Sequence, residues 1–377
     1  MEPKPSVTIL YDAAEDVEKA RAEKAGKPFP LAYAQVADAL EKRGYAVHTA
    51  GVKRKIGELV NAVEKDGSDV IFNLCEAIAG LAQHEHNVVG LLELYQKCYT
   101  GSGSAGWLLA SDKGLSKKIL QFHGIRYPRF CTVEQGNVQW ADDLEFPLIV
   151  KPLNEDASLG IDAGSVVHSV KELLERISRV TEDFRGGALV EEFIEGREIY
   201  VGVLGNDQCE AFPILEWDFS GLKHGPRIAG AEAKWDRESE AYHAPEVFPE
   251  DIPADVVQRI HEIAVATYRA LRVTGYARVD MRLRRAPEKV SSKPRKSTNG
   301  DRHKAAEPTA DSANDAGGWE CFVIEVNPNC WLEKRSEFAM AGRKHGLSYP
   351  DLLERIVHLA QERHAHSVFR PTAARKT

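Results

Sequence analysis

The sequence lacks the features that mark secreted, membrane-spanning and nucleic-acid-binding proteins. Its six cysteines are scattered, with no CxxC pair, which favours free thiols in a reducing compartment over a disulfide framework. No apolar run approaches the roughly 20 residues of a membrane span, and the N-terminal stretch has no apolar segment of signal-peptide length. The formal net charge of -8 argues against non-specific binding to nucleic acid. We therefore expect a cytoplasmic protein.

Familiar nucleotide and metal motifs are absent or weak. The chain contains no GxxxxGK[ST] P-loop. Residues 101–106, GSGSAG, match the GxGxxG dinucleotide fingerprint, but they follow a late strand and lack the acidic residue expected about 20 positions later, so a glycine turn between domains is the better interpretation. His84 and His86 could ligate a metal, although an HxH pair on a polar loop is usually solvated.

Length and periodicity indicate two or three domains. Within residues 1–105, short apolar runs alternate with helical patterns, which predicts a small α/β sheet domain. Residues 106–190 start with a helix that ends near Gly124 and continue into strands. Residues 191–377 are rich in strands separated by turn residues, which favours an antiparallel sheet.

Residues 287–318 differ from the rest of the chain. They are rich in Lys, Ser, Ala, Asp, Pro and Gly and have almost no large apolar residues. Such a segment cannot bury enough surface to offset its ordering entropy. Since it separates two strand-like runs, ARVDMRLRR and WECFVIEVN, we predict a disordered insertion at the tip of a hairpin.

The stretch LIVKPLNEDASLG, residues 148–160, ends a buried strand with Lys151. A lysine in this position brings an ammonium group to the edge of a sheet, where it can meet an anion. The small residues that follow, including Ser158 and Gly160, allow backbone N–H groups to approach a phosphate. A plain hairpin loop would be an equally good interpretation without the motifs that come later in the chain.

Acidic side chains follow on several predicted strands. VEEFIEGREI supplies Glu191 and Glu198, whereas ARVD and IEVNPN supply Asp280, Glu325 and Asn327. Three oxygen ligands on adjacent strands suit Mg²⁺, which binds carboxylates together with nucleotide phosphates. A surface charge is the simplest explanation of any one acid, but Glu325 directly follows the apolar run CFVI and needs a reason to lie there.

The order of these motifs resembles the ATP-grasp fold, and within it the D-alanine–D-alanine ligase family. YTGSG, Asp112-Lys113, FPLIVKP, VEEFIEGREI, AKW, GYARVD and IEVNPN stand in the family order between about residues 69 and 361. The resemblance implies an α/β (α+β) architecture: an N-terminal pre-ATP-grasp domain over residues 1–105, a central subdomain over 106–190 with a phosphate-covering loop, and a C-terminal subdomain over 191–377 with the metal site.

The resemblance also implies a role for each matching residue. Contacts to ATP would come from Lys113, Lys151, Glu191, Glu192, Ile194, Glu198 and Lys234. One or two Mg²⁺ ions, or Mn²⁺, would be held by Asp280, Glu325 and Asn327. In the catalytic step, Ser158 would cover the γ-phosphate, Lys234 would neutralise it, and Arg278 would face the oxyanion of the tetrahedral intermediate. Ser336 would bind the carboxylate of the second substrate.

The chain departs from the family where the first substrate should bind. Its N-terminal loop, ILYDAAEDVEKA, does not match the family's glycine-rich loop with its ammonium-binding glutamate. Ala157 and Trp235 replace a serine and a tyrosine of the same hydrogen-bonded set. One interpretation is a reshaped pocket lined by Ala157, Trp235 and residues 12–18. The other is that Glu15 or Glu76 takes the ammonium.

Together these features predict an ATP-dependent ligase of the D-alanine–D-alanine ligase type, which forms an amide through an acyl phosphate. The substrates would be small amino-acid-like molecules, and the resemblance allows a homodimer. Two alternatives stay open: a ligase for another amino acid or amine acceptor, and a non-catalytic nucleotide-binding protein on the same scaffold.

Overall fold

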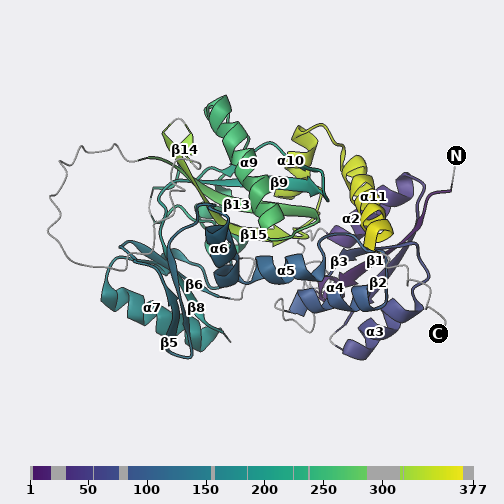
Figure 1. Cartoon of the computed structure of the whole chain (residues 1–377), viewed down its shortest axis with the longest axis horizontal. Helices are drawn as coiled ribbons and strands as arrows, with labels where there is room; N and C mark the ends of the chain where they lie inside the picture. The colour runs from purple at the N-terminus through teal and green to yellow at the C-terminus, as the bar shows by residue number, and fades with distance from the viewer. Residues whose placement is uncertain are drawn as a thin grey trace, which may run out of the picture.

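Three sheets form the framework of the protein (Figure 1). The computed structural model describes residues 3–17, 31–53, 55–75, 84–153, 158–184, 186–223, 225–236, 238–286, 315–316 and 318–367. The sheets have three, five and seven strands among these residues, with helices packed around them. The predicted mixed α/β class is therefore confirmed.

The first sheet is parallel and has the strand order β2-β1-β3. Its strands are β1 (Ser6–Asp12), β2 (Ala46–Val52) and β3 (Val70–Leu74). The helices of this region are α2 (Ala32–Lys42), α3 (Ile56–Lys65) and α4 (Glu85–Leu94). β3 is buried at every position because helices cover a parallel sheet on both faces. The predicted N-terminal α/β domain thus has the expected topology.

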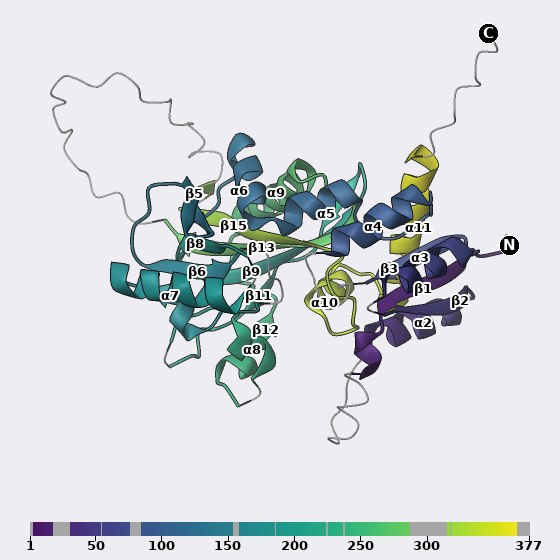
Figure 2. The ribbon, with the colours of Figure 1, turned by 90° about the horizontal axis from the view of Figure 1, so that it is seen from below.

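The last helix of the chain, α11 (Tyr349–Ser367), packs against this first sheet (Figures 1 and 2). Leu353 and Ile356 share one apolar cluster with Val7 and Phe72. Arg363 donates to the carbonyl oxygens of Tyr99 and Gly101 and so ties α11 to the glycine turn. The two ends of the chain are therefore parts of one core.

The second sheet has five strands in the order β5-β4-β8-β6-β7. The strands are β4 (Phe130–Glu134), β5 (Asn137–Ala141), β6 (Leu148–Pro152), β7 (Val166–Val167) and β8 (Ala188–Glu192). A 3₁₀ turn, Ala163–Ser165, precedes β7, and α7 (Val170–Asp183) covers the sheet. The predicted pairing of the two strands around the LNEDASLG loop is confirmed, because β6 and β7 are antiparallel neighbours.

The third sheet is antiparallel and has the order β12-β11-β9-β13-β15-β14, with β10 beside β9. Its strands are β9 (Arg197–Gly205), β10 (Cys209–Ala211), β11 (Leu215–Trp217), β12 (Glu246–Val247), β13 (Gly275–Arg285), β14 (Asp315–Ala316) and β15 (Trp319–Pro328). The helices and turns of this part are α8 (Ala231–Trp235), the 3₁₀ turn Ala241–His243, α9 (Ala254–Ala270) and α10 (Glu337–Lys344).

The predicted hairpin around the low-complexity insertion is confirmed, since β13 and β15 pair from Ala277 and Pro328 as far as Arg285 and Trp319. Residues 287–314 and 317 lie outside the described part of the chain. The predicted C-terminal end of the insertion is wrong. Asp315 and Ala316 form β14 and pair with β15, because backbone hydrogen bonds can order a short edge strand without apolar side chains.

The predicted helix from Trp107 to Gly124 is in fact two helices, α5 (Ser104–Ser111) and α6 (Lys113–Phe122). Asp112 separates them because it has extended dihedral angles and its side chain accepts from the backbone of Leu115, as an N-cap does. Ala110 and Leu120 of these helices lie in the core of the large sheet, although the sequence assigned them to the central region.

Candidate active site

One face of the large sheet brings together most of the predicted catalytic and metal-binding residues. In the antiparallel register, Asp280 of β13 lies opposite Tyr200 of β9 and Glu325 of β15, and Arg278 lies opposite Asn327. Directly paired residues in an antiparallel sheet point to the same face. Alternation along β9 and β13 therefore places these side chains on one surface.

The opposite wall is formed by the five-stranded sheet and by α6. Lys151 of β6 and Glu191 of β8 are buried, and Lys151 Nζ lies 2.6 Å from Glu191 Oε2. Lys113 of α6 is also buried, and its Nζ lies 3.7 Å from Glu325 Oε2 on the large sheet. This ion pair joins the two walls and confirms that Lys113 and Glu325 are spatial neighbours.

Lys117 is a member of the site that sequence reasoning missed. It is 1% exposed, and its ammonium lies 2.7 Å from Glu191 Oε1 and donates to the carbonyl oxygen of Ile324 at 2.7 Å. Burial lowers the pKa of Lys117, whereas the two ammonium groups hold the pKa of Glu191 below its usual value against the opposing effect of burial. The spacing of four from Lys113, which places both lysines on one helix face, was the available signal.

A cleft lies between the two walls. Eight of the predicted residues line it: Lys151, Ser158, Glu191, Glu192, Ile194, Glu198, Asp280 and Glu325. Glu198 is held by three donors, since it accepts from the Tyr200 hydroxyl, from Arg282 and from the backbone N–H of Ala229. Its orientation on the cleft wall is thus fixed before any ligand arrives.

The described end of the predicted phosphate loop contacts the far side of the cleft. Ser158 has a φ of 60°, and its hydroxyl donates to the carbonyl oxygen of Ala229 at 2.6 Å. The backbone N–H of Ala231 donates to the carbonyl oxygen of Ile161 at 2.8 Å, directly at the start of α8. These bonds connect the five-stranded sheet to the helix that carries Lys234. Residues 154–157, and with them Ala157, lie outside the described residues.

The predicted donor set for a divalent cation is two carboxylates and one amide. Burial raises the pKa of Asp280 despite the Arg278 guanidinium, whereas nearby cations, Lys113 foremost, lower that of Glu325 against the effect of burial. Asn327 Nδ2 donates to Asp280 Oδ2 at 3.0 Å. Two buried carboxylates beside an amide provide the hard oxygen atoms that Mg²⁺ prefers, so these residues fit such an ion.

The remaining predicted residues lie beside this set. Arg278 binds both carboxylate oxygens of Asp280, with Nε to Oδ1 at 2.7 Å and Nη2 to Oδ2 at 2.8 Å. The charge of Lys234 acts on Asp280 and Glu325. Ser336 is buried and caps α10 by accepting from a backbone N–H. Trp235 ends α8, but its side chain lies outside the described part of the chain.

Comparisons with known proteins identify the family of the chain. The model of the D-ala D-ala ligase C-terminus matches residues 114–291. A D-alanine–D-alanine ligase of Desulforudis audaxviator is 31% identical over 336 residues, covering 87% of this chain and 92% of that protein. This chain belongs to the D-alanine–D-alanine ligase family. The uncharacterized protein y4sG of Sinorhizobium fredii is 32% identical over 79% of this chain and 76% of its own length.

Solved structures support the same fold. The D-alanine–D-alanine ligase of Bacillus anthracis, whose structure was determined in complex with ATP, superimposes with a TM-score of 0.65 at 20% identity, covering 96% of this chain and 99% of that one. The predicted ATP-grasp architecture is thereby confirmed. Family membership also confirms the expectation of a ligase, and the alternative of a non-catalytic nucleotide-binding protein is not favoured.

The first-substrate region of this family member is partly described. In the helical turn that follows β1, Asp16 accepts from the hydroxyls of Tyr11 and Tyr33, whose ring centroids lie 3.8 Å apart. Asp16 is therefore already engaged by two phenol groups. Glu76 and Glu18 lie outside the described residues, so the choice between a reshaped pocket and another ammonium-binding acid stays a prediction.

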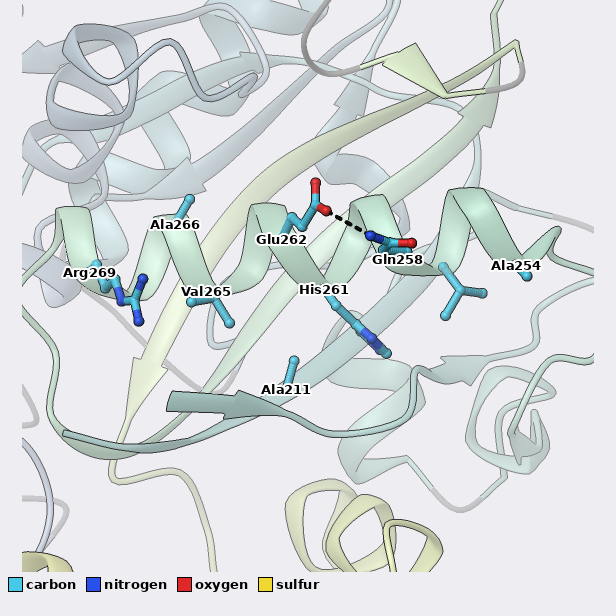
Figure 3. A pocket seen from close by; sticks show the side chains of 9 residues that line it. Ala211, Ala254, Gln258, His261, Glu262, Val265, Ala266 and Arg269 are labelled. Atoms are coloured by element: carbon cyan, nitrogen blue, oxygen red, sulfur yellow. Dashed lines mark hydrogen bonds between the residues drawn. The ribbon is translucent and has the colours of Figure 1, made fainter. Parts of the chain in front are cut away.

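The HxH pair singled out by the sequence is not among the residues that line the cleft. His84 directly precedes α4, and no group of three or more His, Cys, Asp or Glu side chains placed to bind a metal occurs among the described residues. Figure 3 shows a shallow groove between α9 and β10, lined by residues such as His261, Glu262 and Arg269, which were not predicted as site residues. Within the described ranges no helix is long and apolar enough to cross a membrane.

Proposed function

We propose that the chain is an ATP-dependent ligase that joins the carboxylate of one small amino-acid-like substrate to the amine of another, as its relatives named D-alanine–D-alanine ligase do. The observation that carries this proposal is the meeting of two sets of groups across one cleft. The ammonium group of Lys113 pairs with Glu325 of the large sheet, and the charges of Lys151 and Arg278 act on the same carboxylate. Lysine ammonium groups stabilise the charge of ATP phosphates, whereas an arginine stabilises the oxyanion of acyl transfer.

In the first step, a carboxylate oxygen of the donor substrate attacks the γ-phosphorus of ATP. The bond between that phosphorus and the β,γ-bridging oxygen breaks, and ADP leaves. We assign Lys113, Lys151 and Lys234 to the stabilisation of charge on the transferred group, because they lie among the buried carboxylates of the site. The predicted loop of residues 154–160 would exclude water, which otherwise hydrolyses the acyl phosphate.

In the second step, the amine nitrogen of the acceptor attacks the acyl carbon and an oxyanion forms. Arg278 is the group that we assign to this oxyanion. Collapse of the intermediate breaks the carbon–oxygen bond to the phosphate, which leaves with the electron pair, and the nitrogen loses a proton. Ser336, at the positive end of α10, would orient the acceptor's carboxylate.

Mg²⁺ belongs to this proposal as the ion that Asp280, Glu325 and Asn327 would hold. Such an ion neutralises negative charge on the phosphoryl group. The nucleotide contacts of Glu191, Glu192, Ile194 and Glu198 are also proposals, as are a cytoplasmic location and a homodimeric assembly. Among these, Glu191 is tied on both oxygens by lysines, so its contact to adenine would use the remaining lone pairs.

The decisive experiment measures ADP and amide formation from ATP with a panel of D- and L-amino acid pairs. The proposal expects ADP release that requires added amino acids, with one amide per ADP. Asp280→Ala serves as the inactive control, and Glu262→Ala, on the exposed groove of Figure 3, as the matched acid-to-alanine control that keeps full turnover. ATP binding without amino-acid-dependent turnover would refute the proposal.

A further inference from the structure

Helix α10 approaches the active face of the large sheet at a glycine. A Cβ atom on Gly202 of β9 would lie 2.9 Å from Phe338 of α10 and 2.9 Å from Phe212, so a larger residue there would push the helix away. Gly202 is the register partner of Arg278 on β13. The close contact therefore brings the N-terminal turn of α10 beside the arginine.

Glu337, the first residue of α10, uses this approach to reach Arg278. Its Oε2 lies 3.2 Å from Arg278 Nη1, and both side chains are largely buried, with exposures of 20% and 11%. Burial would raise the pKa of Glu337, but the guanidinium outweighs it and keeps the pKa low, so the carboxylate is charged. Buried charge pairs of this kind are strongly directional.

Three groups contact the guanidinium of Arg278, and they differ in whether they also have another proposed role in the site. Asp280 binds it with two hydrogen bonds, but that carboxylate is also a proposed metal ligand. The ring of Tyr200 lies 4.8 Å below the guanidinium and restrains its plane only. Glu337 is a carboxylate from outside the proposed metal set, so it can keep holding Arg278 when Asp280 turns to a cation.

We propose that Glu337 is a positioning residue that holds Arg278 for the oxyanion of the second step; this inference rests on the proposed ligase function. An oxyanion donor acts only where the negative charge develops. When the amine attacks the acyl phosphate, Arg278 must therefore already point at the acyl oxygen. Phosphoryl transfer from ATP depends on the lysines instead, so the two steps respond differently to the loss of Glu337.

The test separates the two steps in the Glu337→Gln variant by rapid quench, with ATP, Mg²⁺ and the best substrate pair from the panel. The ADP burst seen with the donor alone should keep its amplitude and stay within about twofold of the wild-type rate. Amide formation should fall about tenfold or more, a part of the roughly 10²–10³-fold effect of losing an oxyanion donor altogether. The ratio of ADP to amide should rise above one, since water then competes for the acyl phosphate.

Two further variants exclude a merely structural role. If Glu337 acts through Arg278, adding Glu337→Gln to Arg278→Ala should lower amide formation by less than about twofold beyond the single Arg278→Ala change. Glu337→Asp, which keeps a carboxylate, should recover part of the lost rate. Glu246→Gln is the matched control: it replaces a neighbouring glutamate, on which the charge of Glu337 acts, and should leave the ratio at one.

The outcomes are distinguishable. The inference alone is overturned if the wild type is active but Glu337→Gln slows ADP formation and amide formation equally. Additive losses of amide formation in the double variant would also overturn it. A wild type that forms no amide from any pair refutes the proposed function and, with it, the oxyanion role on which Glu337 depends.

Discussion

Lys117, Glu191 and Lys151 form a group of buried charges, and we predict which substitution in this group lowers the unfolding free energy most. Glu191 is the only negative charge of the three and touches both ammonium groups at 2.7 and 2.6 Å. In Glu191→Gln, two buried ammonium groups lose their counter-charge. Removing one partner of a buried ion pair typically costs about 3–5 kcal/mol, and we expect a loss of unfolding free energy in that range.

Lys117→Met should be milder. It leaves the Glu191–Lys151 pair intact and removes an ammonium whose burial is itself unfavourable. The substitution leaves the carbonyl oxygen of Ile324 without its donor, which should lower the unfolding free energy by about 1–3 kcal/mol. We therefore expect Glu191→Gln to lose more unfolding free energy than Lys117→Met, by about 2 kcal/mol.

Urea unfolding at pH 7 measures this order, together with hydrogen exchange of the β6 and β8 amides, which reports on the five-stranded sheet itself. Lys118→Met is the matched control, since Lys118 is exposed and the same substitution there should stay within about 0.5 kcal/mol of wild type. If Lys117→Met destabilises as much as Glu191→Gln, the carboxylate is not the centre of the charge balance and our reasoning is wrong.

Four other predictions follow from the structure. Gly202→Ala should lose about 1–3 kcal/mol of unfolding free energy by overpacking against α10, measured by urea unfolding; an unchanged midpoint would contradict the close contact. Burial and the charge of Glu337 raise the pKa of the Glu246 carboxyl to about 7, although the residue is exposed as a whole. The folded state therefore binds the extra proton, and wild type should lose stability relative to Glu246→Gln as pH rises from about 4.5 to 7; a difference that stays flat with pH refutes this. Asp280→Ala should abolish ADP production while the far-UV circular dichroism stays native, and wild-type turnover would remove the metal assignment. Replacing residues 287–314 by a short Gly/Ser turn should preserve turnover and melting temperature, because β13 and β15 already pair beyond it; a fall in either would show that the segment is structural.

Much of the fold and of the candidate site could be predicted from the sequence. Strand periodicity gave the antiparallel hairpin of β13 and β15, and motif order led to Lys151, Asp280 and Glu325, which line one cleft in the structure. The strand prediction succeeds because periodicity depends on residues close in sequence. The site residues were predicted from the resemblance of their motifs to those of a known family.

Contacts between distant segments were decided only by the tertiary structure. Nothing in the sequence of α11 indicates that Leu353 shares an apolar cluster with Val7 of the first strand, since an amphipathic helix can cover any apolar surface. In the sequence, Lys117 does not differ from other helical lysines, and only the structure shows that it pairs with Glu191 of β8. Likewise, Glu337 meets Arg278 only because Gly202 lets α10 approach the sheet. The sequence by itself determined which chemical groups stand on which elements, and the tertiary packing determined which of those groups share a buried environment where charge must be paired.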